Sequence, residues 1–93
     1  MLLLDISGVA SFADYFVIAS AQTGRQIQAM LESVDEGLSG AGVSTNGREG
    51  DVDSGWVLLD YGDVIVHLLG REEREYYDLE GLWSGAKPVV RVQ

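Results

Sequence analysis

Apolar residues are densest between positions 56 and 69, where two runs are separated by a short polar turn. The first run is Trp56–Leu59 and the second is Val64–Leu69. Their β-branched and large apolar side chains favour a packed sheet. Gly62, between the runs, can adopt the positive φ that a tight turn needs. The pattern predicts an antiparallel hairpin that reverses at Tyr61-Gly62, with the other segments covering it or extending its sheet.

Two earlier apolar runs predict further strands. Leu2–Ile6 and Tyr15–Ser20 are each almost continuously apolar. Such runs are typical of strands that are buried on both faces, as when helices cover a sheet. The stretch before the hairpin, residues 43–55, is instead polar and rich in glycine and aspartate, and its Asn46-Gly47 pair favours a turn.

The clearest helix is expected over Thr23–Ser39. Thr23 can cap its start, and Gln26 three residues later completes a capping-box pattern. Apolar residues then recur at helical spacing and predict one stripe that packs on the core. The members of this stripe are Ile27, Met30, Leu31, Val34 and Leu38.

A second helix is expected between Gly70 and Leu82. Acidic residues near its start suit the positive end of the helix dipole. Gly81 inside the pattern costs about 1 kcal/mol relative to alanine, so the helix is expected to be short or broken near Asp78. The following Val89–Val92 is expected as a loose edge segment.

The order of these elements predicts the fold class. Strand, strand, helix, strand, strand, strand and helix follow one another, which is typical of an α/β domain with a small mixed β-sheet covered by helices. A chain of 93 residues is the size of one domain. We expect a single domain over residues 1–84 and a C-terminal tail over residues 85–93.

The charge of the chain restricts its partners. There are 15 acidic and 6 basic residues, so the formal net charge is −9. Phosphate backbones would be repelled, which argues against nucleic acid as a direct partner, whereas a basic surface would be attracted. The sequence has no cysteine, no signal-peptide pattern and no stretch long enough to span a membrane. We therefore expect a soluble cytoplasmic protein.

Two aspartate pairs raise the alternative of a magnesium-dependent enzyme. Asp51 with Asp53, or Asp60 with Asp63, could hold Mg²⁺ for phosphoryl transfer. Such a site also needs a backbone that cradles phosphate, and no glycine-rich phosphate motif occurs. A calcium loop starting at Asp51 would need glutamate where Gly62 stands. We interpret these residues as turns and predict no catalytic residue, metal or cofactor.

His67 is the only histidine and stands inside the second strand of the hairpin. A catalytic role would need a nucleophile or a carboxylate beside it, and the sequence selects none. A hydrogen-bonded structural histidine is therefore favoured.

Trp56 begins the hairpin and shares one strand face with Leu58 and Asp60. An aromatic side chain beside carboxylates at a sheet edge suits the core. It equally suits an interface with a basic partner, because tryptophan is enriched among the residues that dominate binding energy. These two interpretations stay open at this point.

Several blocks of the sequence, taken in order, resemble the ribosomal silencing factor family, also called Iojap. The resemblance extends from about Leu4 to Trp83, and its most specific part is the run from Trp56 to His67. The matching residues are Asp14–Ala19, Arg25, Gly50, Trp56–His67, Arg74–Glu80 and Leu82-Trp83.

The resemblance implies a fold and a function that composition does not. Family members have a mixed sheet with helices, of nucleotidyltransferase-like topology but without the catalytic carboxylates. They bind the large ribosomal subunit through ribosomal protein L-fourteen, at the face that meets the small subunit. Occupying that face blocks subunit association and represses translation by steric occlusion. The resemblance also implies a homodimer.

The same resemblance suggests where the partner binds. By motif position, Trp56 matches the partner-contacting tryptophan of the family. We add Asp60, Tyr61 and Glu49, because an acidic and aromatic cluster complements a basic surface.

The resemblance also bears on two segments outside the hairpin. It implies a short strand around Val43–Arg48, although Ser44–Arg48 is turn-like. Family members usually have a helical segment before the first strand, which the present sequence does not include.

Overall fold

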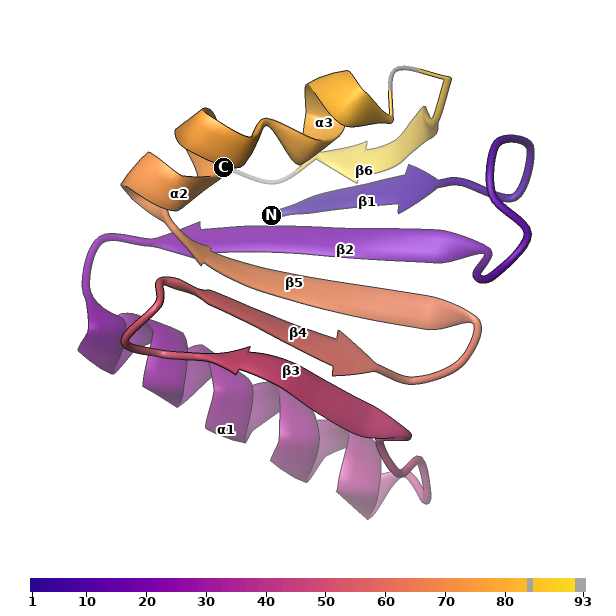
Figure 1. Cartoon of the computed structure of the whole chain (residues 1–93). Helices are drawn as coiled ribbons and strands as arrows, with labels where there is room; N and C mark the ends of the chain where they lie inside the picture. Colours follow the sequence, from indigo (N-terminus) through magenta and orange to yellow (C-terminus); the bar gives the residue numbers. More distant parts are fainter. Residues whose placement is uncertain (84, 92–93) are drawn as a thin grey trace.

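The structure is a computed structural model that describes residues 1–83 and 85–91. In this part of the chain, six strands form one open sheet in the order β3-β4-β5-β2-β1-β6 (Figure 1). The parallel pair β2 and β5 lies at the centre, and every other neighbouring pair is antiparallel. The predicted mixed α/β fold is therefore confirmed. The strands are β1 (Leu2–Asp5), β2 (Tyr15–Ala21), β3 (Gly47–Asp51), β4 (Trp56–Asp60), β5 (Val64–Gly70) and β6 (Lys87–Arg91).

The predicted hairpin is formed by β4 and β5. Leu58 faces His67 across the antiparallel pair. Gly62 in the connection has a φ of 85°, which is the left-handed conformation that the turn was expected to need.

Helix α1 (Gly24–Gly40) begins with the predicted capping box. The Thr23 hydroxyl accepts a hydrogen bond from the Gln26 backbone N–H at 3.2 Å, and the Gln26 side chain accepts one from the Thr23 N–H at 3.3 Å. Two donors that the helix cannot satisfy internally are thereby paired. Ile27 and Leu31 of the predicted stripe are buried.

The side chains of β5 alternate between two halves of the core. Val66 and Leu68 pack with Ile27 and Leu31 of α1, on one face of the sheet. Ile65 and Leu69 point to the other face, which α2 (Arg71–Tyr77) and α3 (Leu79–Leu82) partly cover (Figure 1). Burial on both faces explains why this strand reads as a continuous apolar run. The residues buried with Ile65 and Leu69 are Leu2, Leu4, Ile6, Ala13, Phe16, Ile18 and Leu79.

The strand expected around Val43–Arg48 is displaced toward the C terminus, since β3 spans Gly47–Asp51. The Val43 backbone N–H bonds the carbonyl of Leu38 and so belongs to the end of α1. The Thr45 hydroxyl then donates to a backbone carbonyl, that of Gly47 at 2.8 Å or Asp60 at 3.1 Å. Residues 43–46 are therefore engaged in ending the helix and entering the sheet.

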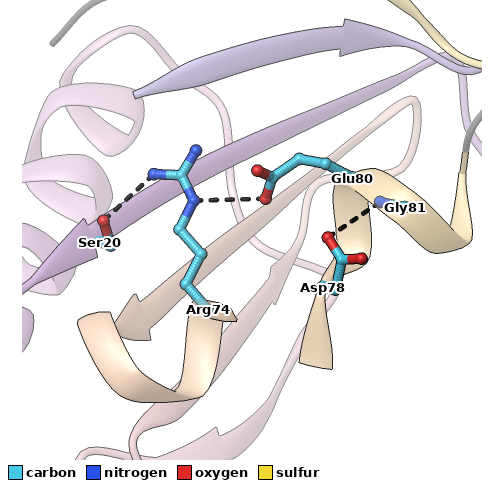
Figure 2. Close-up of polar contacts among 5 residues, drawn as sticks. All are labelled: Ser20, Arg74, Asp78, Glu80 and Gly81. Carbon is cyan, nitrogen blue, oxygen red and sulfur yellow. Dashed lines mark hydrogen bonds and ion pairs between the residues drawn. The ribbon is translucent and has the colours of Figure 1, made fainter. Parts of the chain in front are cut away.

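The second helix is broken at Asp78, as predicted. Asp78 has a φ of 46°, and its carboxylate accepts a hydrogen bond from the Gly81 N–H at 3.2 Å, starting α3 (Figure 2). The Arg74 guanidinium spans the break. Its Nε lies 3.3 Å from Glu80 Oε1, and its Nη1 donates to Ser20 Oγ at 3.1 Å (Figure 2). Arg74 thus ties α2 to α3 and to β2.

Part of the segment expected as a C-terminal tail belongs to the sheet. Lys87–Arg91 forms β6, which pairs antiparallel with β1 and so lies at one edge. Val92, the last residue of the expected edge segment, lies outside the described residues.

His67 is a buried, hydrogen-bonded residue, as the sequence predicted. Only 4% of its surface is exposed, and its Nδ1 accepts a hydrogen bond from the Trp56 indole Nε1 at 3.2 Å. The edge of the Phe16 ring packs against the imidazole, with 4.7 Å between ring centroids. Burial in these apolar surroundings lowers the pKa of His67 from 6.5 to about 4.

This shift predicts acid destabilisation with a defined origin. Between pH 6.5 and 4 the unfolded chain takes up a proton on His67 more readily than the folded chain. Above pH 6.5 His67 is neutral in both the folded and the unfolded chain, and its titration does not lower stability. As the pH falls to 4, protonation of the unfolded chain lowers the free energy of unfolding by about 3 kcal/mol. Urea unfolding at several pH values should show a shallower decline for His67→Gln than for the parent. Equal declines would contradict the assignment.

A second prediction concerns Gly50 in β3. Its φ of 76° is unfavourable for other residues, and an added Cβ would overlap the Trp56 carbonyl oxygen on β4. Gly50→Ala should therefore lower the free energy of unfolding by about 2 kcal/mol or more. Gly47→Ala, in the same strand with open space at its Cβ, is the control. Equal losses in chemical denaturation would refute the explanation.

Candidate functional site

A shallow hollow lies on the face of the sheet opposite α1, where β3, β4 and the end of α2 meet. Its volume is about 350 Å³. We call it the Trp56 hollow. Its lining combines aromatic and apolar side chains with one carboxylate, a composition suited to binding a protein side chain. The lining residues are Glu49, Gly50, Ser54, Trp56, Leu58 and Tyr77.

Trp56 belongs both to the core and to this hollow. Alternation along β4 places it on the same face as Leu58, and both pack against the buried cluster on that side. Its indole N–H is bonded to His67, so the side chain is fixed from beneath. Its other surface remains half-buried at the hollow. The core interpretation of Trp56 is therefore confirmed for one side of the ring, and its role in an interface stays a prediction.

Tyr77 forms a second aromatic wall. Its ring centroid lies 4.6 Å from that of Trp56, and the two ring planes are inclined by 48°. The neighbouring Tyr76 ring contacts Tyr77 edge-on at 5.0 Å and is 82% exposed. Such exposure of an aromatic side chain extends the apolar surface from the hollow toward solvent.

The structure brings Glu49 together with Trp56. Glu49 is exposed on β3, opposite Leu58 in the register of β3 and β4, and its side chain lines the hollow. A carboxylate beside aromatic rings can attract a cation to the same place. Of the four predicted site residues, Glu49 and Trp56 are therefore the two that line the same hollow.

The other two predicted residues lie elsewhere. Asp60 ends β4, and its Oδ1 accepts a hydrogen bond from the Gly62 backbone N–H at 2.8 Å, which shapes the turn. Tyr61 packs with the core cluster on the α1 side, away from Trp56. Burial, and to a lesser extent the Asp35 carboxylate, raises the pKa of the Tyr61 hydroxyl. Neither side chain lines the Trp56 hollow.

Sequence reasoning missed Tyr77 as a site residue. The available signal was a pair of tyrosines at the end of a short helix, where no apolar periodicity requires both in the core. That Tyr77 meets Trp56 depends on how α2 is placed against the sheet, which local patterns do not specify.

The four aspartates of the magnesium hypothesis do not converge. Asp51 Oδ1 accepts a hydrogen bond from the Ser54 N–H at 2.7 Å, at the connection before β4. Asp60 caps the turn after the same strand, so the two pairs lie at its opposite ends. In the described part of the chain, no three histidine, cysteine or acidic residues are arranged to hold a metal. No described helix is long and apolar enough to cross a membrane.

A second cavity, of about 400 Å³, lies where β2 and β5 end and α1 and α2 begin. Ligands of α/β enzymes commonly bind at this end of parallel strands, against helix N-termini. Here Asp53, Glu72 and Glu73 line the cavity together with Arg71. The excess of carboxylates makes it unsuitable for a phosphate group.

Comparison with known proteins identifies the family. A family model described as "Ribosomal silencing factor during starvation" matches residues 1–93. Ribosomal silencing factor RsfS of Chromobacterium violaceum is 42% identical over 89 residues, which are 96% of this chain and 73% of that protein. RsfS of Bacillus subtilis is 38% identical over 86 residues, or 92% and 73% of the two chains. A crystal structure of a protein from C. violaceum matches with a TM-score of 0.84 at 41% identity, covering 98% of this chain and 76% of the other. The chain therefore belongs to the ribosomal silencing factor family.

Proposed function

We propose that this protein binds the large ribosomal subunit through ribosomal protein L-fourteen and blocks association with the small subunit, repressing translation. Membership of the ribosomal silencing factor family supports the ribosome as the target. The Trp56 hollow supports the location of the binding site. A half-buried tryptophan, a tyrosine and a carboxylate that forms no ion pair with any described residue are exposed there together. No covalent chemistry is required, because occupying the surface prevents the second subunit from docking.

The charge distribution supports a basic partner. The chain carries a net charge of −9, and among the described residues one ion pair, Arg74 with Glu80, is present. Glu49 in β3 and the nearby Asp51 and Asp53 are exposed. An acidic surface of this kind accelerates encounter with a basic protein and makes association sensitive to salt.

The proposal also covers the compartment in which the protein acts and its oligomeric state. We infer that the protein acts in the cytoplasm, with bacterial ribosomes as its target, because the similar silencing factors of Chromobacterium violaceum and Bacillus subtilis are bacterial proteins. Homodimerisation stays a prediction. The exposed side chains of Phe12 and Leu82 are apolar surface that a dimer would cover.

Removing an aromatic side chain from the Trp56 hollow should weaken binding to isolated large subunits, as measured by co-sedimentation. Loss of an aromatic anchor costs about 2 kcal/mol or more, which is about 30-fold in affinity. Trp56→Ala also removes the partner of His67, so Tyr77→Ala, at a side chain that is 43% exposed, is the cleaner variant. Tyr15→Ala is the control, because Tyr15 has a similar exposure of 37% but lies on the other face of the sheet. It stands two residues before Val17 in β2, and Val17 packs on the α1 side.

The outcomes separate the activity from the site. Binding by the parent chain and by Tyr15→Ala, with loss in folded Tyr77→Ala, supports both. Normal binding by folded Tyr77→Ala and Trp56→Ala would move the interface elsewhere. A parent chain that does not sediment with large subunits, or that leaves subunit association unchanged in a gradient, would overturn the proposed function.

Charge reversal tests the electrostatic part of the proposal. Glu49→Lys should weaken binding by about tenfold at low salt, because it places a cation where a basic partner docks. Glu36→Lys makes the same charge change on an exposed position of α1, on the other side of the sheet, and should alter binding by less than about twofold. The affinities can be compared at two salt concentrations. Equal effects of the two changes would show that net charge alone matters.

A further inference from the structure

The aromatic walls of the Trp56 hollow are held in place before any partner arrives. The Trp56 ring cannot turn away without breaking its hydrogen bond to Nδ1 of buried His67. The Tyr77 ring belongs to α2, which Arg74 fastens to β2 through Ser20 (Figure 2). A site whose side chains are already ordered loses less conformational entropy when it is filled.

The carboxylate of Glu49 lacks a cation of its own. Among the described residues it accepts no hydrogen bond and forms no ion pair. The adjacent Arg48 is paired in register with Leu59, whose side chain packs on the α1 side. Arg48 accordingly lines a separate groove beside Glu32. The nearest basic residue along the chain thus points to the opposite face of the sheet.

Among the described residues, none that lines the hollow is basic. Its charge and its aromatic faces together match one kind of side chain. We propose that the Trp56 hollow receives a single arginine side chain of the partner protein, with the guanidinium against the Trp56 and Tyr77 rings and within reach of the Glu49 carboxylate. This proposal rests on the proposed function for the identity of the partner and adds the chemistry by which the partner is recognised.

Arginine fits this arrangement better than the other candidates. Its planar guanidinium stacks on aromatic faces and pairs with a carboxylate through two parallel hydrogen bonds. The ammonium group of lysine is a compact and strongly hydrated charge that does neither as well. An apolar side chain would fill the hollow but would cover Glu49 without pairing it. The arginine stem can pack along Leu58, which lines the hollow between the charged and aromatic parts.

The test uses the full chain and two blocked tripeptides, acetyl-Gly-Arg-Gly-amide and its citrulline counterpart. Citrulline keeps the shape of arginine and removes its charge. The indole N–H signal of Trp56 is followed by NMR in a Trp83→Phe background, which leaves one tryptophan. The arginine peptide should shift this signal saturably, with a dissociation constant about three- to fivefold lower than that of the citrulline peptide.

Variants locate the effect. Glu49→Gln should reduce the preference for arginine over citrulline, because the ion pair is lost while the aromatic rings remain, and Tyr77→Leu should remove the saturable shift. Glu36→Gln, on an exposed position of α1, is the matched control and should bind as the parent does. Equal affinities for the two peptides in the parent, an unchanged preference in Glu49→Gln, or no saturable shift with either peptide would each overturn the proposal.

This experiment can fail independently of the proposed function. A chain that sediments with large subunits but does not distinguish the peptides overturns the arginine assignment alone. A chain that prefers the arginine peptide but does not bind large subunits overturns the proposed partner and leaves the side-chain site in place.

Discussion

Strand β5 is the element on which the rest of the structure depends, because neighbours cover both of its edges and both of its faces. It pairs with β2 in parallel and with β4 in antiparallel. Its alternating side chains supply both halves of the core. Every residue of β5 except Val64 is buried, so a misplaced residue could not relax into solvent. The register of the sheet, and with it the location of every surface residue on β4 and β3, follows from how β5 is packed.

The single polar side chain inside β5 links this packing to the surface. His67 needs a donor for its Nδ1, and the Trp56 indole supplies it from the neighbouring strand. The bond orients a large ring at the place where the end of α2 meets the sheet and Tyr77 contacts Trp56. A buried polar residue therefore specifies the arrangement of an exposed site, which an apolar residue of the same size would not do.

Patterns within one segment predicted the fold well. The hairpin, the capped helix α1 and the break at Asp78 each depend on neighbouring residues, and each was predicted from the sequence. The start of β3 was displaced because Thr45 and Asn46 bond to the distant Asp60 carbonyl, and no local signal reports that contact. Alternation of side chains along the chain indicates that Tyr61 and Trp56 face opposite sides of the sheet. The contact between Tyr77 and Trp56 instead depends on how α2 packs against the sheet, and one bond between these elements joins Arg74 to Ser20 across 54 positions of sequence.

The outer edge of β3 has a consequence for how the molecule behaves in concentrated solution. This strand ends the sheet, so its outward backbone groups offer a template on which another chain could add. Its five residues include three charges, Arg48, Glu49 and Asp51, and the left-handed Gly50 interrupts the regular pleat. Charges and an irregular backbone discourage intermolecular strand pairing. The short strand that carries Glu49 thereby also protects the protein against aggregation through its sheet edge.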